Sequence, residues 1–245
     1  VLKPARYRRR EHAVELGEIF LFVGTHFVVS VRHGKATELS GVRHAIEARP
    51  DLLRMGPSAV LHGILDHVVD DYRAATTDLE QQIEEEIEAE VLLPKSRCSP
   101  EDIYKLKREV LQFNTATAPL LEPLELLAHS KTPLIHPEIA DYLRDVHDHL
   151  LKVVHDIHRF RELLANAMDL HLSSTSARLN ARLGQLTLVA SLFLPLTFLT
   201  GFFGMNFGYL VNHIGSQAAF GLGLLLMVAS VVLQLLFFRR SGFLS

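Results

Sequence analysis

The sequence predicts a mainly α-helical membrane protein, in which a water-soluble helical region precedes two C-terminal transmembrane helices. Three observations lead to this class. All 28 acidic residues lie at or before Asp169, and only four arginines and no lysine follow it. Two long uncharged apolar stretches lie in this last part. A helical pattern without proline runs through 138–194 and joins the two regions.

The first 57 residues read as part of a mixed α/β region. Residues 17–23 and 26–31 alternate enough to form strands, and Gly24-Thr25 between them predicts a tight hairpin. Residues 37–49 predict a helix that ends before Pro50. Because two strands do not form a stable sheet alone, we interpret 1–57 as the remnant of a truncated N-terminal α/β domain.

Three helices are predicted next. The first covers Ser58–Val91, and the second runs from Ser99 to about Ala128 with kinks at Pro119 and Pro123. The third begins near Glu138 and continues into the first apolar stretch. At about 1.5 Å per residue, this helix would be on the order of 100 Å long, which suits the transmission of movement.

The two apolar stretches are Leu186–Phe203 and Ala218–Phe238, and both are long enough to cross a bilayer core. Basic residues precede the first and follow the second, whereas the loop 204–217 has no Lys or Arg. The positive-inside rule therefore places both termini in the cytoplasm and the loop outside.

Two spans cannot enclose a path for a polar solute, so they either anchor the protein or line a path that several copies share. Small and polar residues recur on the first span at heptad-like spacing. Such a stripe fits helix packing as well as pore lining. It consists of Asn180, Gly184, Thr187, Ser191, Leu194, Phe198 and Gly201.

Other chemistry is sparse. The single Cys98 excludes a disulfide framework, and no nucleotide-binding, hydrolase or zinc-protease motif is present, so we expect no enzyme. His155 and His158 could share a helix face, but a zinc site normally needs three or four converging ligands. The glutamates of 80–90 are either a solvated face or a surface that attracts divalent cations. Nothing indicates nucleic-acid binding.

The turn after the first span has the chemistry of an ion site. Gly204 allows unusual dihedral angles and leaves its carbonyl accessible, and Asn206 offers a neutral amide oxygen. Mg²⁺ keeps most of its water shell, and a ring of neutral oxygens can bind those waters weakly enough for release. In isolation, the same residues also fit an ordinary helix end.

Together with the two spans, these motifs make the chain resemble the CorA family of magnesium channels, which has two C-terminal spans and a Gly-x-Asn signature. The resemblance covers essentially the whole chain. It is carried by Gly204-Met205-Asn206-Phe207, Phe193-Leu194-Pro195-Leu196-Thr197-Phe198, Leu172-Ser173-Ser174, Arg144-Asp145-Val146-His147-Asp148-His149 and Val69-Asp70-Asp71-Tyr72.

The resemblance implies a homopentamer with a cytosolic funnel and a pore lined by the first span. Gly204, Met205 and Asn206 would form the external selectivity ring. The pore and gate positions would be Asn180, Leu183, Leu186, Thr187, Leu194, Thr197 and Gly201, with Leu186 and Leu194 as hydrophobic constrictions. Regulatory Mg²⁺ would bind Asp169 between subunits, with Asp145 at a secondary site, and hold the closed state.

Two positions depart from the family pattern. The partner carboxylate for Asp169 comes from a stretch that reads Arg8-Arg9-Arg10-Glu11-His12 here, so Glu11 is the remaining acidic ligand candidate. The outer loop, which often carries acidic residues in the family, has none in 207–217.

We therefore expect a Mg²⁺ channel, with Co²⁺ and Ni²⁺ as further ions, in the plasma (inner) membrane. The alternatives are a Zn²⁺ transporter of the same superfamily and a membrane-anchored helical scaffold that transports nothing. Expected partners are further copies of the chain, membrane lipid and divalent cations, without nucleic acid. The predicted regions are 1–57 (α/β remnant), 58–185 (cytosolic long-helix region), 186–203 (first span), 204–217 (outer loop), 218–238 (second span) and 239–245 (basic cytosolic tail).

Overall fold

The computed structural model describes residues 1–8, 13–34, 36–92, 100–129, 132–205 and 217–240. Its contacts divide the chain into two compact units, Val1–His171 and Leu172–Ser245. The prediction of a mainly helical chain with one long helix and a C-terminal apolar helix is confirmed.

The first unit begins with two antiparallel hairpins. Strand β3 (Glu18–Val23) pairs with β4 (Val28–His33), close to the predicted hairpin. The hairpin that precedes it in the chain, in which β1 (Ala5–Arg8) pairs with β2 (Ala13–Leu16), was not predicted from the sequence. Strand β1 alternates buried and exposed residues, but four residues are too few for this period to stand out in the sequence.

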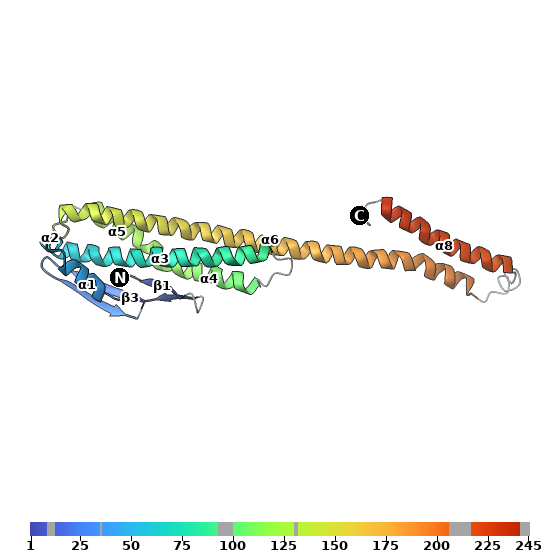
Figure 1. The fold of residues 1–245 in the computed structure, drawn as a ribbon, viewed down its shortest axis with the longest axis horizontal. Coiled ribbons are helices and arrows are strands. Elements are labelled where there is room, and N and C mark those ends of the chain that lie inside the picture. Colours follow the sequence, from blue (N-terminus) through green and yellow to red (C-terminus); the bar gives the residue numbers. More distant parts are fainter. Residues whose placement is uncertain (9–12, 35, 93–99, 130–131, 206–216, 241–245) are drawn as a thin grey trace. The chain divides into compact units, whose positions relative to one another are not determined.

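Short and long helices follow. Helix α1 (Ser40–Glu47) lies inside the predicted range, and the one-turn helix α2 (Pro50–Leu53) was not predicted. Helix α3 covers Pro57–Leu92, one residue beyond the prediction at each end. Both α1 and the strand β1 contact α3 (Figure 1).

The predicted second helix is divided at one of its two prolines. Helix α4 (Pro100–Thr117) is followed by the 3₁₀ turn η1 (Ala118–Leu120), which contains Pro119, and by α5 (Leu121–His129). Pro123, where the second kink was expected, follows this interruption directly. Pro123 is the third residue of α5, where a helix has no intrahelical partner for the N–H that proline lacks.

A core of aromatic and aliphatic side chains holds the first unit together. Tyr72 of α3 is fully buried, and its ring lies edge-on to Phe113 of α4 with centroids 5.9 Å apart. Its hydroxyl donates a 2.7 Å hydrogen bond to the carbonyl of Lys3, which attaches the N-terminal segment to the helices. Burial raises the pKa of this hydroxyl, so Tyr72 stays a neutral donor.

Helix α6 covers Pro137–Phe203, as the uninterrupted pattern predicted. Its first part packs into the core with one face, and Ala167 is the last of the buried residues along it. The buried side chains of this part are Ile139, Leu143, Val146, Leu150, Val153, Val154, Ile157, Phe160, Leu164 and Ala167.

The second unit contains the end of α6 and helix α8 (Gln217–Arg240). In both helices a window of 18 residues is apolar enough to cross a membrane, and only 0% and 6% of these windows are buried. Helices whose apolar surface stays uncovered require an apolar solvent or further helices around them. This exposure distinguishes them from the core helices of the first unit.

Candidate ion-conducting site

The last part of α6 presents two distinct faces. All seven predicted pore and gate residues are exposed, with Leu186 at 68% and Leu194 at 72%. A second face is only half-exposed and consists of Gly184, Leu188, Ser191, Leu192, Pro195, Leu196 and Leu199. At 100° per residue, the centres of the two faces lie about 140° apart around the helix.

This division splits the small-residue stripe seen in the sequence between the two faces. Thr187, Leu194 and Gly201 belong to the exposed face, whereas Gly184 and Ser191 belong to the half-exposed one. Apart from the backbone of α6 itself, a β-carbon added at Gly201 would meet no atom of the described residues within 4 Å. Packing against the described part of the chain therefore does not explain the glycine at this position.

The threonine hydroxyls on the exposed face have a fixed orientation. Thr187 donates a 2.8 Å hydrogen bond to the carbonyl of Leu183, and Thr197 donates one of 2.8 Å to Phe193. Because the hydroxyl proton is used within the helix, the lone pairs of each oxygen remain as acceptors. The water molecules around a hydrated cation are hydrogen-bond donors, so this face matches their chemistry.

The end of α6 shows why glycine is needed at position 204. The Gly204 amide donates a 2.9 Å hydrogen bond to the carbonyl of Thr200. A β-carbon on Gly204 would lie 2.9 Å from that same oxygen, closer than real β-carbons approach. The expectation of unusual dihedral angles is not met, since the described glycines with positive φ are Gly34 and Gly56.

The other two predicted filter residues are described in part. Met205 is 43% exposed, and its amide donates a 3.3 Å hydrogen bond to the carbonyl of Phe202. Asn206 and the loop 206–216 lie outside the described residues. The predicted selectivity ring therefore stays a prediction at Asn206.

The predicted regulatory carboxylates do not form a metal site within the described part of one chain. Asp145 and Asp169 are both exposed on α6, and at 1.5 Å per residue they lie about 36 Å apart along the helix. Glu11 lies outside the described residues. No group of three or more His, Cys, Asp or Glu among the described residues could hold a metal ion.

The other candidates from the sequence lie on the solvated surface. His155 and His158 are exposed. In the acidic part of α3, Glu85 accepts a hydrogen bond from Gln81, and Glu80 forms an ion pair with Arg159 of α6. These contacts fit a solvated helix face that also ties α3 to α6.

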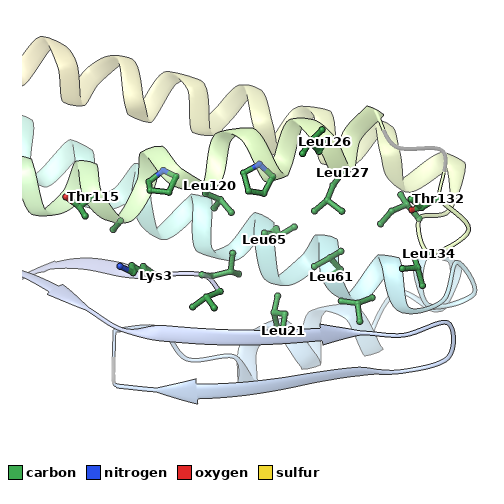
Figure 2. A pocket seen from close by; sticks show the side chains of 17 residues that line it. Lys3, Leu21, Leu61, Leu65, Thr115, Leu120, Leu126, Leu127, Thr132 and Leu134 are labelled. Atoms are coloured by element: carbon green, nitrogen blue, oxygen red, sulfur yellow. The ribbon is translucent and has the colours of Figure 1, made fainter.

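The first unit also contains an apolar cavity of about 610 Å³. Figure 2 shows leucines from β3, α3 and α5 around the same space, among them Leu21, Leu61, Leu65 and Leu127. Lys3 is the only ionisable side chain among its described lining residues. Because a cation site needs several converging oxygen or nitrogen ligands, this mostly apolar lining, which contains no Asp, Glu or His among the described residues, does not suit an ion.

The fold defines a class of protein in which a long helix and a second C-terminal helix are both long and apolar enough to cross a membrane. The model of the family of CorA-like Mg²⁺ transporter proteins matches residues 1–240. The chain therefore belongs to this family, whose members are divalent metal transporters and not enzymes.

Individual relatives agree with this assignment. The cobalt/magnesium transport protein CorA of Thermotoga maritima is 28% identical over 100% of this chain and 69% of its own length. The zinc transport protein ZntB of Yersinia pseudotuberculosis is 23% identical over 89% of this chain and 64% of its own length. The structure of the CorA magnesium transporter from Methanocaldococcus jannaschii matches the fold with a TM-score of 0.83, at 24% identity, over 99% of this chain and 76% of that one.

Proposed function

We propose that this chain is the subunit of a Mg²⁺ channel, with Co²⁺ and Ni²⁺ as further transported ions. The observation that carries the proposal is the exposed face of α6, on which threonine oxygens are held as hydrogen-bond acceptors. In a family of divalent metal transporters, a face of this kind suits a hydrated divalent cation.

Several copies must share the path, because two helices of one chain cannot surround an ion. We infer a homopentamer in the inner membrane, with the exposed faces of five α6 helices around one axis and both termini in the cytoplasm. Leu186 and Leu194, at 68% and 72% exposure in a single chain, would meet their counterparts at this axis. Rings of leucine would close the path by excluding water.

The selectivity ring is proposed at the outer end of α6. The backbone oxygens of Gly204 and Met205 and the amide oxygen of Asn206 are neutral acceptors, which bind the waters of Mg²⁺ without removing them. The 2.9 Å approach between a β-carbon at 204 and the Thr200 carbonyl supports a turn that only glycine allows at this point.

Regulation by internal Mg²⁺ is proposed at carboxylates between subunits. Asp169 and Glu11 would contribute to one site and Asp145 to a second, since Asp145 and Asp169 are about 36 Å apart along α6. Both described carboxylates are exposed and so can reach groups of a neighbouring copy. Bound Mg²⁺ would hold the closed state, and its loss would let like charges repel and the helices move.

Zn²⁺ transport is the second candidate, and the similarity to a zinc transport protein favours it. The fourteen histidines of the chain fit this ion in a general way. However, none of the pore and gate positions named above is His or Cys. Since Zn²⁺ prefers nitrogen and sulfur ligands whereas Mg²⁺ prefers oxygen, the face itself favours Mg²⁺.

The experiment is an ion-flux assay with the full chain in proteoliposomes. Mg²⁺ and Zn²⁺ are offered separately under a membrane potential, each with and without a pH gradient. Wild type is compared with Asn206→Ala, and Asn212→Ala in the same loop serves as the matched control.

We expect Mg²⁺ flux that is driven by the potential, abolished by Asn206→Ala and retained in Asn212→Ala. Zn²⁺ flux that requires the pH gradient would establish the second candidate instead. Absence of flux of either ion through wild type would contradict both and would leave a scaffold that only anchors.

A further inference from the structure

The four arginines of the second unit form the only set of Lys or Arg side chains that follows Asp169. All four are exposed in the structure, Arg178 and Arg182 on α6 and Arg239 and Arg240 at the end of α8. No acidic residue follows Asp169 in the sequence. No carboxylate side chain of this unit therefore offsets the charge of the four arginines.

The arginines of α6 point away from the exposed face that carries the proposed pore. At 100° per residue, Arg178 lies about 140° and Arg182 about 100° from the centre of that face. This placement is electrostatically sensible, because rings of five arginines around the axis would repel a divalent cation. The guanidinium groups instead face the outside of the proposed assembly.

The position of these groups along the helices matches the phosphate layer of a membrane. Arg182 precedes Leu186, the first residue of the apolar stretch, by about 6 Å of helix rise, and Arg178 by about 12 Å. Arg239 and Arg240 directly follow the last apolar residue, Phe238. Since the headgroup region is about 5–8 Å thick on each side of the hydrocarbon core, Arg182, Arg239 and Arg240 lie at phosphate depth.

We propose that Arg182, Arg239 and Arg240 form a binding site for the phosphate groups of anionic phospholipids, with Arg178 as a weaker outer contribution. The proposal rests on the proposed function for the direction of the α6 face. Guanidinium groups bind phosphate through paired hydrogen bonds and lose little hydration in doing so. The two crossings of the chain bring both arginine pairs to the same leaflet, so one lipid layer contacts all four.

The experiment measures lipid binding, so it does not depend on ion flux. The full chain is reconstituted in phosphatidylcholine vesicles that contain a trace of spin-labelled phosphatidylglycerol or spin-labelled phosphatidylcholine, and the immobilised fraction is measured. The variants are Arg182→Gln/Arg239→Gln/Arg240→Gln and the single Arg178→Gln. The control is Arg161→Gln, which removes the same charge from an exposed position of α6 about 37 Å before Leu186.

Wild type and Arg161→Gln are expected to bind phosphatidylglycerol at least about fivefold more strongly than phosphatidylcholine. This lower bound is the factor that corresponds to a single arginine, which contributes about 1 kcal/mol near the membrane surface. The triple variant should bind both lipids equally, and Arg178→Gln should lose only part of the preference. About 1 M NaCl should abolish the preference, since screening is then strong.

Equal binding of both lipids by wild type, or an unchanged preference in the triple variant, would overturn the proposal. So would displacement of the labelled lipid by millimolar inorganic phosphate, because the site would then hold free phosphate. Since loss of arginines can change membrane orientation, phosphatidylglycerol adducts are also counted by mass spectrometry on detergent-purified protein. Equal adduct numbers for wild type and the triple variant would again contradict the site.

Discussion

Replacing Thr187 by valine tests the role of the threonine oxygens on α6. Valine has almost the same shape as threonine but lacks the hydroxyl that donates to the Leu183 carbonyl at 2.8 Å. That carbonyl can keep its helical hydrogen bond, so we expect the fold to be unchanged. What is lost is an acceptor on the exposed face, where a net hydrogen bond contributes about 1 kcal/mol.

If the ion passes this ring in the rate-limiting step, the loss of one such contact is expected to lower Mg²⁺ flux by about fivefold. The five added methyl groups would lower the flux further, because they exclude water from the path. Flux into proteoliposomes is measured with a Mg²⁺ indicator under a fixed potential. Ser191→Ala is the matched control, because Ser191 makes the same type of hydrogen bond, 2.7 Å to Thr187, but lies on the half-exposed face. Unchanged flux in Thr187→Val, or a larger loss in Ser191→Ala, would refute the reasoning.

Three further predictions concern the filter, the core and pH. Gly204→Ala should abolish Mg²⁺ flux in the same assay, because its β-carbon would lie 2.9 Å from the Thr200 carbonyl. Tyr72→Phe should lower the free energy of unfolding of the first unit by about 1–3 kcal/mol, measured by denaturant titration, because the carbonyl of Lys3 loses its buried donor. Burial is the main cause that lowers the pKa of His62 below its ordinary value of 6.5. As the pH falls below 6.5, the unfolded chain therefore takes up this proton more readily than the folded chain, and the free energy of unfolding decreases. His62→Gln should reduce the loss of thermal stability between pH 7.5 and pH 5.5.

Each of these predictions has a clear contrary result. Wild-type flux in Gly204→Ala would mean that the turn tolerates a side chain. Equal denaturation midpoints for Tyr72→Phe and wild type would mean that the hydroxyl contributes no stability. The same pH dependence in His62→Gln as in wild type would assign acid sensitivity to other groups.

The long helices could be predicted from the sequence because their signals extend over many turns. The apolar residues of α3 and α6 recur without a break, and Pro195 alone did not end α6. The hairpin of β3 and β4 was recognisable from its alternation and turn residues. Strands β1 and β2 were missed because each has only four residues, too few for an alternating pattern to stand out in the sequence.

The candidate site could be predicted only in part. The heptad-like spacing located the stripe on α6, but it could not tell which of its residues are exposed in a single chain. The structure separates Ser191 from Thr187 in this respect, although both fit the same heptad pattern. The sequence analysis explained Gly204 by unusual dihedral angles, but Gly204 is not among the described glycines with positive φ. Glycine is required there because a β-carbon would come too close to a backbone oxygen.

The central claim is that the exposed face of α6 lines the path of the ion. The most direct test replaces Cys98 by serine and then places one cysteine at Thr187 or at its neighbour Leu188, which is half-buried on the other face. Mg²⁺ flux is recorded before and after a charged thiol reagent is added. The account predicts block of the Thr187→Cys channel and no change in Leu188→Cys. Block of Leu188→Cys with an unaffected Thr187→Cys would contradict it.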